Sequence, residues 1–158
     1  MDILDTQTKT LVKPLEAQFA KFPVLPVGGR EFIVNITPWV ALILGVLSIL
    51  GFALSILGLG ALTALAPVGA ASKVGLTGIW LIPSVIGLVE GVLWLLAYKP
   101  LKNRALRGWN LLFWITLLGL VSSLVTTFAI FSTFSLVWVL IWLVVELYFL
   151  FQIKSYYK

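Results

Sequence analysis

The sequence predicts an all-α, polytopic membrane protein: a bundle of four transmembrane helices preceded by a short amphipathic N-terminal helix. Two observations predict this class. Apolar residues make up 61% of the 158 residues and charged residues 11%, whereas soluble domains average about 45–50% and about 25%. Residues 36–72 and 108–145 contain no charged residue, and each stretch is far longer than the roughly 20 residues that one spanning helix needs.

A β-barrel is the other fold that can span a membrane, because it also pairs every backbone polar group. It requires polar and apolar residues to alternate along each strand. Residues 136–145 read LVWVLIWLVV and are apolar on every side, which favours helices. Four helices agree better with the charge pattern described below than three or five.

The first element, residues 1–35, is expected to be a cytoplasmic or interfacial lead. Pro14 would break a helix that began at Asp2, but it suits the first position of one running to Phe22. We expect that helix to lie on the membrane surface; the alternative is a frayed tail that becomes ordered only against a partner. The prolines and glycines of residues 23–29 predict an irregular connector. The apolar residues that predict the amphipathic helix recur at helical spacing: Leu11, Leu15, Phe19 and Phe22.

The transmembrane domain is predicted to cover residues 36–154. Its first span is expected at about 38–59, because Thr37 is a good N-cap and Pro38 suits the first helical position. Residues 66–78 are rich in glycine, alanine and proline, so we expect a loop there. The second span is expected at about 79–98, with Pro83 kinking or delaying its first turn.

The second uncharged stretch must fold back on itself, because 38 residues in one helix would measure about 57 Å, almost twice the hydrocarbon thickness. We place the turn at the polar cluster of Ser132, Thr133 and Ser135. The third span is therefore expected at about 109–129 and the fourth at about 133–153. Residues 155–158 form a short tail.

Lysine and arginine residues fall almost entirely on one side of these four spans. Lys73 alone lies on the other side, and the positive-inside rule then places both termini in the cytoplasm. We interpret the basic loop at residues 99–107 first as a topology signal and second as a contact for anionic lipid headgroups. Nucleic-acid binding is not expected, because the cluster is short and lies against the membrane. The ten basic residues of the first side are Lys9, Lys13, Lys21, Arg30, Lys99, Lys102, Arg104, Arg107, Lys154 and Lys158.

Small residues indicate where the spans pack, because helices in lipid approach most closely at such positions. Gly87 and Gly91 of the second span form a GxxxG pattern, and the first span offers a broad face of small residues. We favour packing of these two spans within one chain over dimerisation. The fourth span is bulky and aromatic, and it is a candidate lipid or partner face. The residues expected at the packing positions are Gly45, Ser48, Gly87, Gly91 and Gly119.

Glu90 and Glu146 are the only charged residues inside the predicted spans. They lie at matching depths, about 13 Å and about 12 Å from the basic boundary at 1.5 Å per residue. A carboxylate in hydrocarbon is costly and usually faces the bundle interior, so we expect one or both to be protonated at neutral pH. The functional interpretation is a site for protons or a cation. The structural interpretation, which we favour from sequence alone, is a neutral acid hydrogen-bonded to Ser, Thr or Trp across a helix interface.

The residue types present do not favour thiol chemistry, metal binding or catalysis. The chain has no Cys and no His, so thiol chemistry and the commonest metal ligand are both excluded. We expect no cofactor, no metal site and no enzymatic activity. Intramembrane aspartyl proteolysis requires paired Asp residues, whereas Asp2 and Asp5 both lie in the N-terminal lead.

Three short stretches carry a resemblance: Thr37-Pro38-Trp39, residues 108–114 (GWNLLFW) after a basic loop, and residues 149–158 (FLFQIKSYYK). The chain resembles a group of small four-span bacterial membrane proteins of unknown function, which implies a bacterial inner-membrane setting and supplies no functional residue. The sequence favours a structural or accessory protein that packs with itself or with a larger membrane complex. The alternative is a proton- or cation-coupled transporter or channel subunit using Glu90 and Glu146, acting as a homo-oligomer. The lipid bilayer is the expected surrounding in both cases.

Overall fold

The computed structural model describes residues 3–65, 71–130 and 133–158, which are helical almost throughout. It confirms the predicted fold class, because four of the described helices are long and apolar enough to cross a membrane. The elements in chain order are α1 (Ile3–Phe19), α2 (Val27–Leu65), α3 (Ala71–Lys102), α4 (Leu106–Ile130), α5 (Thr133–Ile153) and a 3-10 turn, η1 (Lys154–Tyr156).

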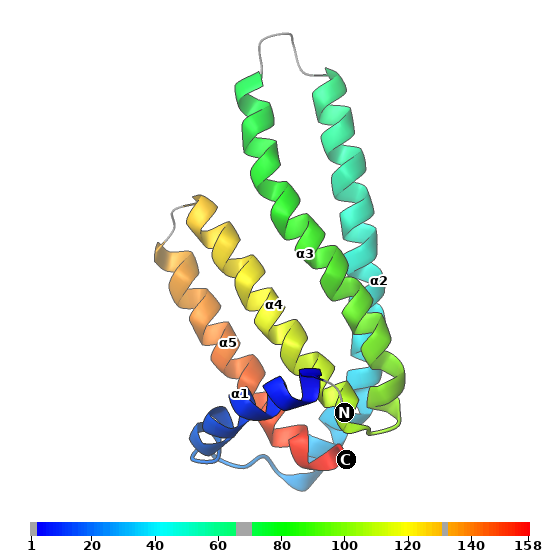
Figure 1. Ribbon diagram of the computed structural model, residues 1–158, viewed down its shortest axis with the longest axis vertical. Coiled ribbons are helices and arrows are strands. Elements are labelled where there is room, and N and C mark those ends of the chain that lie inside the picture. The colour runs from blue at the N-terminus through cyan, green and yellow to red at the C-terminus, as the bar shows by residue number, and fades with distance from the viewer. Residues whose placement is uncertain (1–2, 66–70, 131–132) are drawn as a thin grey trace.

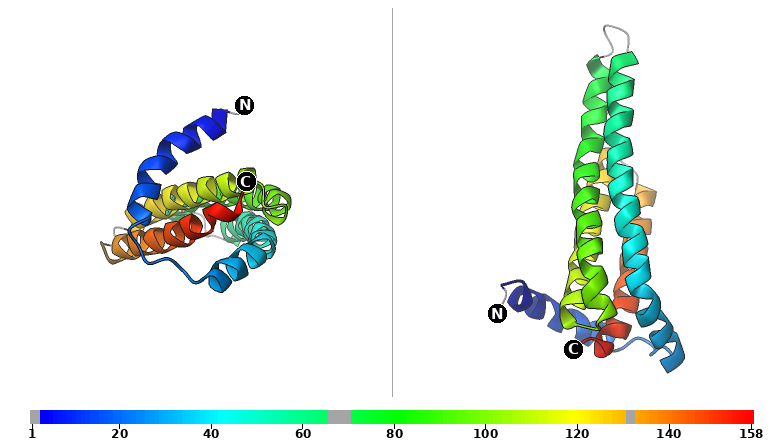
Figure 2. Two further views of the ribbon diagram at one scale, coloured as in Figure 1. Left: turned by 90° about the horizontal axis from the view of Figure 1, so that it is seen from below. Right: turned by 90° about the vertical axis from the view of Figure 1, so that its right-hand side faces the viewer.

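The four long helices form two antiparallel hairpins that lie side by side, and both termini lie at the same end of the molecule (Figure 1). Contacts are most extensive between α2 and α3 and between α3 and α4. Because α2 has 39 residues and α5 has 21, their lengths are about 58 Å and about 31 Å at 1.5 Å per residue. The α2–α3 hairpin therefore extends well beyond α4–α5 at the end away from the termini (Figures 1 and 2).

Helix α2 begins earlier than predicted. It starts at Val27 and carries Pro38 in its interior, so the expectations of an irregular connector through residues 27–29 and a helix start at Pro38 were wrong. The Arg30 N–H donates to the carbonyl of Pro26 and closes the first turn. Thr37 does not cap a helix; its hydroxyl donates to the Ile33 carbonyl at 2.6 Å, one turn earlier in α2.

Helices α1 and α3 also run through residues that were expected to interrupt them. Pro14 lies inside α1 and Pro83 inside α3, and α3 begins at Ala71, so the loop predicted over residues 66–78 was wrong from residue 71 onward. In lipid the backbone has no water to bond with, so a spanning helix such as α3 continues through glycine and proline more readily than a helix in water. This reason does not apply to α1, which lies outside the candidate spans. Residues 66–70 and Ser132 lie outside the described residues. Helix α5 spans residues 133–153 as predicted, so Thr133 and Ser135 belong to this helix and the expectation that they form the turn was wrong.

Helix α1 lies beside the bundle, at the end that carries the termini (Figure 2). Trp114 of α4 donates its indole N–H to the Thr8 hydroxyl at 2.9 Å, and the Phe19 ring stacks on Phe151 at 5.2 Å between centroids. Thr8 and Val12 are buried, whereas Leu11 and Phe22 are each 44% exposed. The helix is amphipathic, but its buried face includes positions 8 and 12 rather than 11 and 22.

The largest fully buried side chains in the described part of the chain are Trp109 and Phe113 of α4, which are 1% and 0% exposed. Their rings stack at 5.8 Å between centroids, and Phe151 of α5 meets Trp109 edge-on at 5.7 Å. The Trp109 indole N–H donates to the Leu150 carbonyl of α5 at 2.8 Å. This cluster therefore joins α4 to α5 near the end where the chain begins and finishes.

The turn between α3 and α4 is tight. Arg104 has a φ of 52°, a left-handed conformation, and a Cβ on Gly108 would lie 2.7 Å from the Leu101 nitrogen. Glycine is therefore required for α4 to start directly against the end of α3. The last residue, Lys158, is tied to this turn by two backbone bonds, accepting from the Leu106 N–H at 2.8 Å and donating to the Arg104 carbonyl at 3.0 Å.

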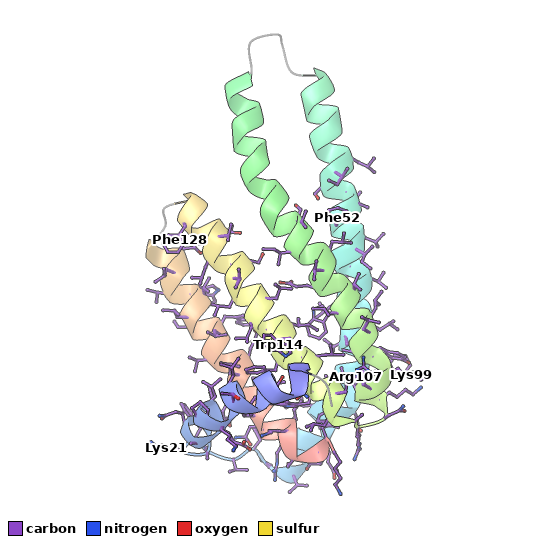
Figure 3. All side chains as sticks on the ribbon, in the orientation of Figure 1. Lys21, Phe52, Lys99, Arg107, Trp114 and Phe128 are labelled. Atoms are coloured by element: carbon purple, nitrogen blue, oxygen red, sulfur yellow. The ribbon has the colours of Figure 1, made fainter. Side chains whose placement is uncertain are left out.

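The predicted basic loop lies at this same end, where Figure 3 shows Lys21, Lys99 and Arg107. Lys99, Lys102, Arg104 and Arg107 are all exposed. Lys102 lies 5.8 Å from the Trp39 ring centre, and Arg104 donates to the Asn35 side-chain oxygen at 3.2 Å. Lys154 pairs with Glu16 of α1. The basic residues of the lead, loop and tail that the structure describes thus share one end of the molecule.

Tyr157 gives this end a pH-dependent contribution to stability. It lies just beyond the last candidate span and is 4% exposed, and among the described residues its hydroxyl has no hydrogen-bond partner. Burial raises the pKa of Tyr157 from 10.0 to about 12, and the Arg104 charge opposes this rise. The folded protein therefore holds the phenolic proton more tightly than the unfolded chain. This contribution is fully present below about pH 10 and is lost as the pH rises through about 12.

Tyr157→Phe is expected to remove this loss, because phenylalanine has no proton to release. Between about pH 10 and about pH 12, the free energy of unfolding of the wild type should fall by up to about 2–3 kcal/mol more than that of the variant. At neutral pH it should be no less stable, since the hydroxyl has no partner to lose. Unfolding of both proteins in the same detergent, followed by circular dichroism over a pH series, measures the difference. Parallel pH profiles for the two proteins would refute the prediction.

Candidate functional site

The two intramembrane glutamates line one cavity. Its volume is about 380 Å³, and α2, α3, α4 and α5 all contribute to its wall. Glu90 projects from α3 and Glu146 from α5, and the hydroxyls of Thr37 and Thr116 add further polar groups. Two acids that face one cavity can hold a proton or a cation between them.

Glu90 provides the buried side of the site. Its Oε1 atom is buried and has no hydrogen-bond partner in the described part of the chain. That atom lies 3.7 Å from the position that a Cβ on Gly119 of α4 would take, so the missing side chain of Gly119 leaves space for the carboxyl. Buried polar atoms in folded proteins are nearly always hydrogen-bonded, so this carboxyl oxygen is free to accept a hydrogen bond or to bind a cation in the cavity.

Glu146 provides the exposed side. Its Oε1 accepts a hydrogen bond from the Trp142 indole N–H at 2.9 Å, one turn earlier on α5. Glu146 also lines a second cavity of about 400 Å³ between α4 and α5, whose wall includes Ser123, Trp138 and Trp142. Thr116, Gly119 and Glu146 are common to both cavities. The polar surface therefore continues from Glu90 past Glu146 into the gap between α4 and α5.

The crossing of α2 and α3 sets the direction of Glu90. A Cβ on Gly91 would lie 3.0 Å from the Ser48 Cβ and 3.1 Å from the Gly45 carbonyl oxygen. Gly91 therefore faces α2 at close range. Neighbouring residues on a helix point about 100° apart, so Glu90 turns away from α2 toward Gly119 of α4.

Gly87, expected among the packing positions, has a different surrounding. A Cβ at Gly87 would meet nothing within 4 Å, so among the described residues it takes no part in helix packing. Gly45 and Gly91 are both buried, and a Cβ on Gly45 would lie 2.8 Å from the Leu95 side chain. The close approach of α2 and α3 therefore occurs around Gly45, Ser48 and Gly91, without the other half of the GxxxG pattern.

The sequence did not identify the aromatic part of the site. Trp94 and Phe149 line the first cavity with the glutamates. Trp94 lies four residues after Glu90, one turn along the same helix, and this spacing is the sequence signal that could have identified it. Across the described ranges, no group of three or more His, Cys, Asp or Glu residues could hold a metal ion. None of Lys99, Lys102, Arg104 and Arg107 lines either cavity.

Comparison of the chain with protein-family models, curated proteins and solved structures gives no match.

Proposed function

We propose that this multi-pass membrane protein binds protons or a cation at Glu90 and Glu146 and acts as a small coupled transporter or channel subunit. The observation that carries the proposal is the buried, unpartnered Oε1 of Glu90 on a cavity that Glu146 shares. An unpaired carboxylate within the hydrocarbon region is costly. A bound proton or cation removes that cost, and exchange between the two is the basis of coupling.

The contacts of the two acids favour binding over a purely structural role. A structural acid is expected to form a hydrogen bond across a helix interface. Glu146 instead bonds Trp142 of its own helix, and the buried Glu90 oxygen has no partner in the described residues. These carboxyls are therefore poorly placed to hold helices together and well placed to receive a ligand.

An accessory role is the second candidate function, and the outer face of α5 favours it. Trp138 and Trp142 are 60% and 57% exposed, and both side chains stand beside the gap between α4 and α5. Large aromatic side chains are common in the cores of protein interfaces. A second copy of the chain or a larger membrane complex could pack against this face.

We also propose that both termini lie in the cytoplasm and that the membrane is a bacterial inner membrane. The common location of the lead, the basic loop and the tail supports the orientation, because basic residues are retained on the cytoplasmic side. The bacterial setting follows from the resemblance of the sequence to small four-span bacterial proteins. A cavity between the hairpins is compatible with assembly into a homo-oligomer.

The test of the transport proposal is proton flux into liposomes that contain the purified protein and a pH-sensitive dye. The wild type is expected to collapse an imposed pH gradient. Glu90→Gln and Glu146→Gln should each slow the flux more than about tenfold, a change of roughly 1.4 kcal/mol. Glu31→Gln is the matched control, because Glu31 is an exposed carboxyl in the first turns of α2 and does not line the cavity.

Flux that survives both glutamine substitutions would refute coupling at these residues. The same assay with an inward gradient of Na⁺ or K⁺ separates proton movement from movement of an inorganic cation. An inactive wild type that copurifies in a stable complex would instead support the accessory role.

A further inference from the structure

We infer that the two-glutamate cavity binds a monovalent organic ammonium ion with an apolar body, which enters from the lipid through the gap between α4 and α5. The inference rests on the proposed function for the role of Glu90 and Glu146 in transport, but the binding site itself is argued from cavity size, lining and charge. Each of these properties favours an organic cation over an inorganic one.

The cavities are too large and too apolar for a bare metal ion. Their volumes are about 380 and about 400 Å³, and they meet at Thr116, Gly119 and Glu146. A calcium ion takes about six to eight oxygen ligands. In the first cavity the two carboxyls and two threonine hydroxyls of the described side chains supply at most six oxygens, and one of these, Glu146 Oε1, already accepts a hydrogen bond from Trp142. An ammonium ion with hydrocarbon substituents needs fewer oxygens and fills more of the space.

Aromatic rings stand beside the carboxyls in both cavities. Trp94 and Phe149 line the first, and Trp138 and Trp142 line the second. An alkylated ammonium ion is attracted to the face of an aromatic ring, most strongly to tryptophan, and the attraction increases when the ion leaves water. Carboxylates combined with tryptophan faces therefore suit a cation that also carries apolar surface.

The charge of the site favours a ligand that carries one positive charge. Glu90 and Glu146 are the titratable side chains among the described residues of the two cavity walls, and no Lys or Arg accompanies them. One bound monocation together with one proton leaves the pair neutral, which is the least costly state within a bilayer. The cation and the second proton therefore compete, and affinity for the cation should increase with pH.

The route of access follows from the exposed side of the site. Glu146 is exposed, and Trp138 and Trp142 are more than half exposed at the outer surface of the α4–α5 hairpin. These residues lie within the last candidate span, so lipid rather than water faces them. A ligand dissolved in the bilayer can reach Glu146 directly and then pass Thr116 and Gly119 toward Glu90.

The test is equilibrium binding of radiolabelled benzyltrimethylammonium to the full-length protein in lipid nanodiscs. We expect saturable binding that weakens as the pH is lowered, because protons and the cation compete for the same two carboxylates. Excess Na⁺ or K⁺ should not displace the label. Glu90→Gln and Glu146→Gln should each weaken binding by roughly tenfold or more and Trp142→Ala by roughly threefold or more, whereas Glu31→Gln should leave binding unchanged.

A second measurement requires no substitution and so does not depend on the folding of a variant. Unlabelled benzyltrimethylammonium should displace the label, whereas neopentylbenzene, its uncharged isostere, should not. Displacement by neopentylbenzene, or the absence of saturable binding to the wild type, would overturn the inference. Proton flux without ammonium binding would overturn it and leave the proposed function intact. Ammonium binding without any flux would support the site and refute transport.

Discussion

Trp109→Ala is expected to lower the free energy of unfolding by about 3–5 kcal/mol, the usual cost of truncating a buried aromatic side chain to alanine. The indole is 1% exposed, stacks on Phe113 and meets Phe151 edge-on. Alanine would remove these contacts and the hydrogen bond to the Leu150 carbonyl. Because this cluster links α4 to α5, the hairpin that carries Glu146 should loosen.

Trp109→Phe separates ring packing from the hydrogen bond. Phenylalanine retains most of the aromatic contact but cannot donate to Leu150, so we expect a smaller loss of about 1 kcal/mol. Trp138→Ala is the surface control, because the Trp138 side chain is 60% exposed. Thermal unfolding of the three variants in one detergent ranks them. Equal losses for Trp109→Ala and Trp138→Ala would contradict the assignment of Trp109 to the core.

Gly108→Ala is expected to destabilise the protein by about 1–3 kcal/mol through overpacking. Its Cβ would lie 2.7 Å from the Leu101 nitrogen and 2.9 Å from the Pro100 carbonyl carbon. Both are backbone atoms, so no side-chain rotation can relieve the contact and the α3–α4 turn must open.

Gly51→Ala is the matched control for this substitution. Gly51 also lies in a helix, and a Cβ there would meet nothing within 4 Å. Alanine at such a site should be neutral or stabilising by up to about 1 kcal/mol, because it reduces the freedom of the unfolded chain. The unfolding midpoints of the two variants check the prediction, and a Gly108→Ala protein as stable as Gly51→Ala would show that the turn is looser than described.

The sequence was sufficient to predict the fold class because hydrophobic length and charge position are properties of the chain itself. Helix α5 has the predicted bounds, Thr133–Ile153. Predicted helix ends were wrong where they relied on rules learned from water-exposed helices: Pro38, Pro14 and the glycine-rich stretch after Ala71 all lie within helices. In the spanning helices α2 and α3, the requirement to satisfy the backbone in lipid outweighs such local signals.

The sequence predicted the two glutamates of the candidate site but not the cavity that they share. Glu90 and Glu146 stand out individually because a carboxyl within an apolar span is costly. Their shared cavity depends on how the helices rotate about their axes, which the close contact of Gly91 with Ser48 and Gly45 determines for α3. Small residues occur on several faces of these spans, and Gly87 shows that a small residue alone does not identify the contact. The role of Trp94 in the cavity wall depends on the same rotation.

The account depends most on the claim that Glu90 and Glu146 face one cavity, and cysteine cross-linking tests that claim directly. The chain contains no Cys, so two introduced thiols are the only reactive ones. Glu90→Cys combined with Glu146→Cys should cross-link within one chain through a short bifunctional thiol reagent. The control pair is Glu90→Cys with Val144→Cys, because Val144 lies at nearly the same depth but about 200° around α5 and is exposed. Efficient linkage of the first pair and little of the second is the predicted result; equal or reversed efficiencies would contradict the shared cavity and the function built on it.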